Sequence, residues 1–175
     1  MRIASVGHGV FAAVMVGLGI LGLIKSDLAT FARPIPKDFP AREVLDYLCA
    51  LICLVSGFGL FWRRTGALAA RLLLAYLLLC MLLFNMRIII RHPLVEVAYQ
   101  QWGQIAVLIA AAWVLYAGFA TDWDRRQIGI ATGEKGLRIA RVFYGLALIG
   151  FGFSHFAYLE NTTVLVPAWL PGHVF

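Results

Sequence analysis

The chain has 175 residues, of which 62% are hydrophobic and 14% charged, and its formal net charge is +6. A soluble domain carries about 45–50% apolar and about 25% charged residues, so one small water-soluble core would not hide this apolar surplus. The basic residues lie mostly between apolar runs and accompany no nucleic-acid-binding motif. This pattern excludes a nucleic-acid partner and favours contact with the lipid bilayer and its phospholipid head groups.

Five apolar runs are long enough to cross a bilayer as helices, which takes about 20 residues each. In chain order, these helices are predicted near residues 6–24, 44–62, 66–84, 103–120 and 139–159. The runs are continuous and about twice as long as a barrel strand, which favours helices over a β-barrel. The sequence therefore predicts an all-α integral membrane protein, with a single transmembrane helical domain over residues 1–175.

Two connectors carry most of the charge between the predicted helices. Asn85–Trp102 is expected to be a polar connector, and Thr121–Arg138 a charged loop. Lysine and arginine are enriched in cytoplasmic loops, and their distribution here favours a cytoplasmic N-terminus. We therefore expect a multi-pass protein of the cell membrane, with residues 25–43 and 160–175 as proline-containing outer segments.

An internal repeat is indicated by two similar stretches, Gly17–Pro40 and Gly150–Pro171. Each begins with Gly-x-Gly on a predicted helix, has an acidic residue ten positions later (Asp27 and Glu160), and ends with two prolines that flank an aromatic residue. Repeated half-units are common in membrane folds. The alternative is chance similarity, because aligning the prolines requires a two-residue gap.

The second stretch, GFGFSHFAYLENTTVLVPAWLP, resembles the DoxX-like membrane proteins. Those proteins combine a glycine-rich helix, a His-Phe pair and a proline segment. The residues that carry the resemblance are Gly150, Gly152, His155, Phe156, Pro167, Trp169, Leu170 and Pro171. In that family the proline segment leads into another transmembrane helix, whereas this chain stops at Phe175. We therefore expect either a fragment or a variant that lacks its last helix.

The resemblance implies a redox-linked role. Some DoxX-like proteins resemble a subunit of a thiosulfate:quinone oxidoreductase, and others are linked to redox or thiol homeostasis. It therefore implies quinone as a cofactor and a membrane or redox protein as a partner. The sequence contains no nucleophile triad, P-loop or metal-ligand cluster that would assign an enzymatic reaction.

A first candidate site is centred on His155, since a polar group inside a bilayer needs a partner or a task. Glu160 follows five residues later, and Trp169 lies in the same outer segment. A histidine and a carboxylate together would bind a quinone carbonyl and relay its proton. The alternative is that His155 bonds a helix carbonyl and holds the proline segment in place.

A second candidate site lies in the segment NMRIIIRH, where Arg87 and Arg91 are four residues apart. With Asp27 they are expected on the outer face, where the arginines would bind thiosulfate, another oxyanion or a lipid head group. The alternative is ordinary juxtamembrane charge.

Arg71 lies inside the predicted third helix and needs a counter-ion or access to water. We expect it either to neutralise Asp46 or an anionic ligand, or to extend towards the interface near Arg63 and Arg64. Asp46 is expected near the opposite membrane face, where Arg87 or Arg91 is the better partner. These alternatives remain open from the sequence alone.

The three cysteines lie inside apolar runs, which argues against a secreted disulfide framework. Cys49 and Cys53 share one helix face, but an i,i+4 spacing does not bring two sulfurs together on a regular helix. We expect them to be packing residues, with a redox pair as the alternative.

Two functions follow from these observations. The first is a redox-linked accessory subunit that holds a quinone or a sulfur oxyanion near the outer face. The second is a non-catalytic scaffold, assembly factor or small permease. Convergence of the His155 and Arg91 regions on one pocket would favour the first.

Overall fold

The structure, a computed structural model, describes residues 5–25, 42–91 and 96–157. These residues are almost entirely helical, and no strand occurs among them. Five of the described helical segments are long and apolar enough to cross a membrane, which confirms the predicted fold class. They are α1 (Val6–Lys25), α2 (Arg42–Leu60), α3 (Arg63–Cys80) with its continuation, α5 (Glu96–Phe119) and α7 (Gly133–Ala157).

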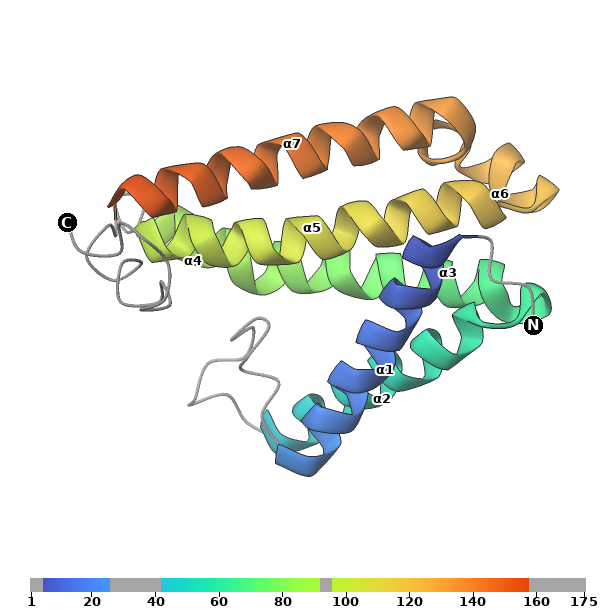
Figure 1. The fold of residues 1–175 in the computed structure, drawn as a ribbon, viewed down its shortest axis with the longest axis horizontal. Coiled ribbons are helices and arrows are strands. Elements are labelled where there is room, and N and C mark those ends of the chain that lie inside the picture. Colours follow the sequence, from blue (N-terminus) through green and yellow to red (C-terminus); the bar gives the residue numbers. More distant parts are fainter. Residues whose placement is uncertain (1–4, 26–41, 92–95, 158–175) are drawn as a thin grey trace, which may run out of the picture.

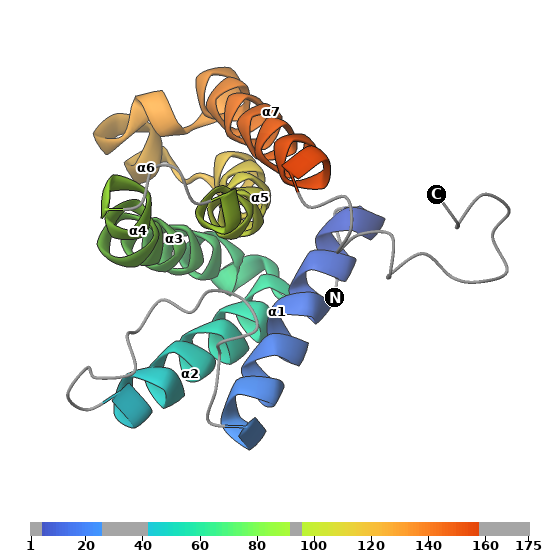
Figure 2. The same cartoon turned by 90° about the vertical axis from the view of Figure 1, so that its left-hand side faces the viewer.

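The spans form two groups that lean away from each other. Figure 1 shows α3, α5 and α7 running side by side, while α1 and α2 form a pair inclined to them. In Figure 2 the α1–α2 pair projects below the other three spans. The groups meet along α2 and α3 and at the start of α1, where the His8 ring packs edge-on against Phe119 of α5. Within the α1–α2 pair, His8 Nε2 donates to the Leu60 carbonyl oxygen at 2.9 Å.

Small residues bring α1 and α2 into close contact. A Cβ added to Gly19 would lie 2.7 Å from the Leu54 Cβ, and one added to Gly57 would lie 2.8 Å from the Val16 backbone nitrogen. The apolar core is formed mainly by α3 and α5, with fully buried side chains such as Leu73 and Ile109, and Met15 of α1 and Leu60 of α2 belong to it as well. Close backbone packing by small residues is the usual way for helices to associate in lipid.

The third span is longer than the sequence predicts. Helix α3 continues through a π-helical turn, η2 (Met81–Asn85), into α4 (Met86–Arg91), so the span reaches from Arg64 to Arg91. The expected polar connector Asn85–Trp102 is therefore helical at its start, and it is also helical at its end, where α5 begins at Glu96. Two features explain the helical start: Met86–Arg91 is mostly apolar, and long arginine side chains tolerate a membrane boundary.

The expected charged loop is also largely helical. It contains α6 (Asp122–Gln127), a 3₁₀ turn η3 (Gly129–Ala131) and the first turns of α7. A capping box begins α6: the Asp124 amide donates to Thr121 Oγ1 at 3.3 Å, and the Thr121 amide donates to Asp124 Oδ2 at 2.9 Å. Gly133 then takes a φ of +58°, a conformation that favours glycine, to redirect the chain into α7.

The structure describes the proposed internal repeat only at its helical start, over residues 17–25 and 150–157. Gly19 lies against α2, and a Cβ on Gly150 would lie 3.4 Å from the Tyr99 carbonyl oxygen of α5. Gly17 and Gly152 have no such neighbour within 4 Å. The two proline segments lie outside the described residues, so the repeat stays a prediction.

Candidate functional site

The six sequence-predicted site residues lie only partly within the described structure. Arg87 and Arg91 are on α4, and both side chains are exposed. His155 belongs to α7, but its side chain is outside what is described. The remaining three lie outside the described residues: Asp27, Glu160 and Trp169. The structure therefore does not bring the His155 and Arg91 regions together or separate them, and both sites stay predictions.

Arg71 has a partner that the sequence did not indicate. Its Nη2 atom lies 2.7 Å from Oδ1 of Asp124, and its guanidinium carbon lies 4.8 Å from the centre of the Trp123 ring. The Tyr116 hydroxyl donates to the same Oδ1 at 3.0 Å, and the Thr121 hydroxyl donates to Oδ2 at 2.6 Å. Asp124 is fully buried within this cluster. We call these five residues the Asp124 cluster.

The electrostatics of the Asp124 cluster favour a fixed negative charge. Burial by itself raises the pKa of the Asp124 carboxyl group. Hydrogen bonds from the Thr121 side chain and backbone, from Tyr116 and from Arg71 outweigh it and lower the pKa to about 2. The carboxylate thus stays ionised at neutral pH and ties α6 to α3 and α5. We interpret the cluster as structural.

Two expectations about charged partners are corrected by these contacts. Arg71 pairs with Asp124 and not with Asp46, and its predicted extension towards the interface near Arg63 and Arg64 stays a prediction. Asp46 lies 3.4 Å from Arg42 Nε, one helical turn earlier on α2, which supplies the cation expected from Arg87 or Arg91. The Thr-x-x-Asp capping pattern at Thr121 was the available sequence signal, because it places Asp124 at a helix start beside the membrane.

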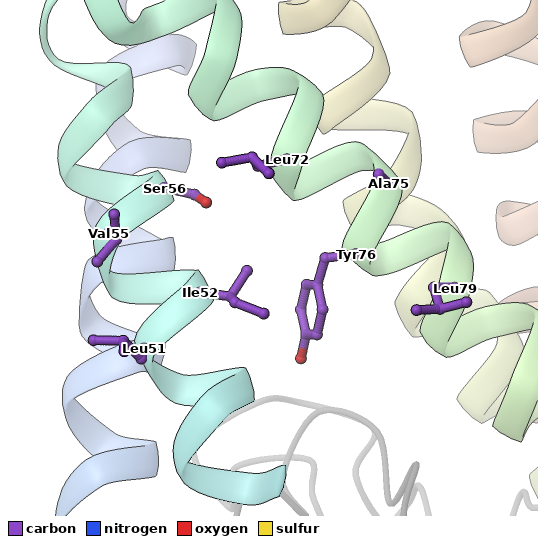
Figure 3. A pocket seen from close by; sticks show the side chains of 8 residues that line it. All are labelled: Leu51, Ile52, Val55, Ser56, Leu72, Ala75, Tyr76 and Leu79. Atoms are coloured by element: carbon purple, nitrogen blue, oxygen red, sulfur yellow. The ribbon is translucent and has the colours of Figure 1, made fainter.

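An apolar groove of about 440 Å³ opens between α2 and α3. Figure 3 shows the two helices diverging, with Ile52 of α2 and Tyr76 of α3 projecting into the space between them. Four further groove residues (Leu51, Val55, Leu72 and Leu79) are about half exposed, so the groove faces the lipid. Its volume falls within the range of about 300–1,000 Å³ typical of small-molecule sites.

Three cysteines lie near Tyr76 beside this groove. Cys49 and Cys53 come from α2 and Cys80 comes from α3, and all three interact electrostatically with Tyr76. Cys49 and Cys80 also interact with each other. All three are free cysteines, and within the described part of the chain no three His, Cys, Asp or Glu side chains converge closely enough to hold a metal ion. We call these four residues the thiol cluster.

The thiol cluster was missed because the cysteines were compared only within one helix. Cys49 and Cys53 are four residues apart on α2, and Tyr76 and Cys80 are four residues apart on α3. Two such pairs on consecutive antiparallel helices meet when each presents that face to the other. The matched spacing was the available signal.

Asn85 is a further buried polar group on the third span. Its side chain is 4% exposed, and no hydrogen-bond partner was found for its Nδ2 atom in the structure. It ends the π-helical turn, which packs against α5. Wide turns of this kind often occur at functional positions, but Asn85 does not line the α2–α3 groove.

Comparisons of the chain with protein-family models, with curated proteins and with solved structures gave no match. The functional interpretation therefore depends on the groove, the thiol cluster and the Asp124 cluster.

Proposed function

We propose that this multi-pass membrane protein is a quinone-linked redox accessory protein that binds a quinone in the α2–α3 groove. The observation that carries the proposal is a lipid-facing apolar groove with a phenol hydroxyl beside it. A quinone is a flat apolar ring with two carbonyl acceptors, so it needs apolar walls and a small number of hydrogen-bond donors. The groove offers both.

The polar lining of the groove supports a quinone over a lipid acyl chain. Ser56 and Tyr76 line it and carry hydroxyl groups, and Ser56 is 2% exposed. Either hydroxyl would donate to a quinone carbonyl, whereas an acyl chain offers no acceptor to repay burial of these groups. Leu51 and Val55, which are exposed to lipid, would accompany the isoprenoid tail.

The wider cellular role is part of the same proposal. The resemblance of Gly150–Pro171 to DoxX-like proteins agrees with an accessory role beside a membrane or redox partner protein. The lysine and arginine distribution supports a cytoplasmic N-terminus in the cell membrane. The predicted His155 and Arg87–Arg91 sites would then act at the outer face, separately from the groove.

The test is quinone binding by the purified protein in lipid nanodiscs. We expect decylubiquinone to bind the wild-type chain with saturation, and Ala75→Phe to weaken binding at least tenfold because the ring fills the groove. Ala13→Phe is the matched control: Ala13 is exposed on α1, away from the groove. Equal binding by both variants would place the site elsewhere. No saturable binding by the wild-type chain would favour the scaffold, assembly-factor or permease alternative.

A further inference from the structure

We propose that Cys49 and Cys80 form a reversible disulfide between α2 and α3, and that the quinone in the groove is its electron acceptor. The choice of acceptor rests on the proposed function, whereas the pairing of the two cysteines does not. Sequence spacing shows no Cys-x-x-Cys motif, so the pair exists only through the packing of two helices.

The register of the α2–α3 hairpin brings the two cysteines level. Gly59 of α2 faces Ala69 of α3, since a Cβ on Gly59 would lie 2.8 Å from the Ala69 Cβ. Cys49 is ten residues before Gly59, and Cys80 is eleven residues after Ala69. At about 1.5 Å per residue, the two cysteines lie about 15 Å and about 16.5 Å from that contact on antiparallel helices. The electrostatic interaction between their thiols agrees with this register.

The two thiols are placed for disulfide formation, and the third is not. Neighbouring sulfurs on two facing helices need a side-chain rotation and an approach to reach the bonded distance of about 2.05 Å. Cys53 is only six residues before Gly59, about 9 Å from the Gly59–Ala69 contact, so it is not level with Cys80. It shares α2 with Cys49, where an i,i+4 bridge is unfavourable. Cys53 is therefore a matched control in the same helix.

Tyr76 connects the thiol pair with the groove. Its side chain interacts with both Cys49 and Cys80 and also lines the groove. A quinone bound there would lie next to the phenol that neighbours both cysteines. Tyr76 would then pass a proton from a thiol to the quinone oxygen.

The reaction balances without any further reactant. Two S–H bonds break, one S–S bond forms, and the thiol pair loses two electrons and two protons. The quinone gains both electrons and both protons and becomes a hydroquinone. No net charge remains inside the bilayer, where an isolated charge would be costly. The reverse reaction would regenerate the dithiol from hydroquinone.

The test uses reduced full-length protein in nanodiscs, mixed anaerobically with decylubiquinone. We expect one hydroquinone per chain, the loss of two alkylatable thiols, and a Cys49–Cys80 disulfide in peptide mapping. Cys49→Ser and Cys80→Ser should abolish hydroquinone formation, and Cys53→Ser should retain it. Mapping of the wild-type chain decides the question even if a serine variant fails to fold.

The outcomes separate this inference from the proposed function. Saturable quinone binding without a Cys49–Cys80 disulfide would overturn the inference and leave the quinone site standing. A Cys49–Cys80 disulfide formed with diamide, but no quinone binding, would support the pairing and overturn the quinone as its acceptor. A thiol–quinone adduct, or a disulfide that contains Cys53, would overturn the pairing itself.

Discussion

The third span holds polar groups of two kinds, which divide it into a charged end and a neutral end. At the charged end, midway along α3, Arg71 carries a full charge and meets the buried Asp124 carboxylate. At the neutral end, five and nine residues further on, Tyr76 and Cys80 carry a hydroxyl and a thiol. Arg71 is about one-third exposed, whereas Cys80 is 5% exposed. Access to water therefore decides whether a membrane helix tolerates a charged side chain or only a neutral polar one.

The same difference distinguishes the residues that stabilise the fold from the residues that are proposed to react. Asp124 accepts hydrogen bonds from several neighbours and pairs with a cation, so a change in its protonation would weaken the whole cluster. The thiol cluster contains no Asp, Glu, Lys or Arg side chain, and in the proposed reaction its groups would lose hydrogen atoms without leaving a charge in the bilayer. We therefore assign the stabilising role to the charged end and the proposed reaction to the neutral end.

The largest expected effect is at the charged end. Asp124→Ala removes the partner of Arg71 and Tyr116 and breaks the α6 capping box, and we expect it to lower the free energy of unfolding by about 2–4 kcal/mol. Unfolding in mixed micelles with increasing SDS measures this. Asp122→Asn, an exposed acid in the same helix turn, is the control and should cost below about 0.5 kcal/mol. Equal losses would show that the buried pair is not the stabilising element.

The next effect is the pH dependence of the same cluster. A carboxyl pKa lowered from 3.8 to about 2 contributes stability above pH 4 that is lost as the pH falls towards 2. The linked free energy is about 2 kcal/mol. Melting temperatures of the wild-type chain should fall over this window, and the corresponding slope should be reduced in Asp124→Ala. A slope unchanged by that substitution would assign the acid sensitivity to other carboxyl groups.

A smaller effect is expected where α2 and α3 touch in the first half of α3. Gly59→Ala places a methyl group against Ala69, and we expect it to separate the helices at a cost of about 1–2 kcal/mol. The change should also slow formation of the Cys49–Cys80 disulfide by diamide. Gly17→Ala is the control: the added Cβ would have no neighbouring atom within 4 Å, so the free energy of unfolding should be unchanged or slightly raised. An unchanged disulfide rate in Gly59→Ala would show that the pairing does not depend on this register.

The smallest effect on stability belongs to the neutral end. Tyr76→Phe removes one hydroxyl and should cost below about 1 kcal/mol, because hydrogen bonds within membranes contribute little on average. Its reduction of decylubiquinone should nevertheless slow several-fold, with the slowing greatest at high pH where fewer protons come from solvent. Tyr144→Phe, on the exposed side of α7, should match the wild-type chain in both measurements. A normal rate in Tyr76→Phe would remove this residue from the proton route.

The sequence predicted the fold class and the five spans, because long apolar runs have few alternatives in lipid. Its errors were at the ends. The helical extension Met86–Arg91 was predicted to be part of a connector, because its arginines indicated exposure to water. The start of α7 was predicted six residues too late in the chain. In both segments the long side chains reach the interface while the backbone stays helical.

The sites were less predictable because they depend on rotation and register between helices. The Arg71–Asp124 pair joins α3 to the α5–α7 connection, and no pattern along one helix shows it. The thiol cluster likewise joins two helices whose relative rotation is set by packing at Gly59. The His155 prediction used a motif within one segment, and it stays a prediction.

The length of the third span links the thiol pair to the bilayer itself. The helical run from Arg64 to Arg91 has 28 residues, or about 42 Å of helix, whereas the hydrocarbon layer is about 30 Å thick. The surplus is accommodated by tilt or by projection of α4 into the head-group layer. A thicker membrane would stand this helix more upright, and the depth and inclination of Cys80 would change with it. Lipid chain length is therefore a physical variable that would tune the geometry of the groove.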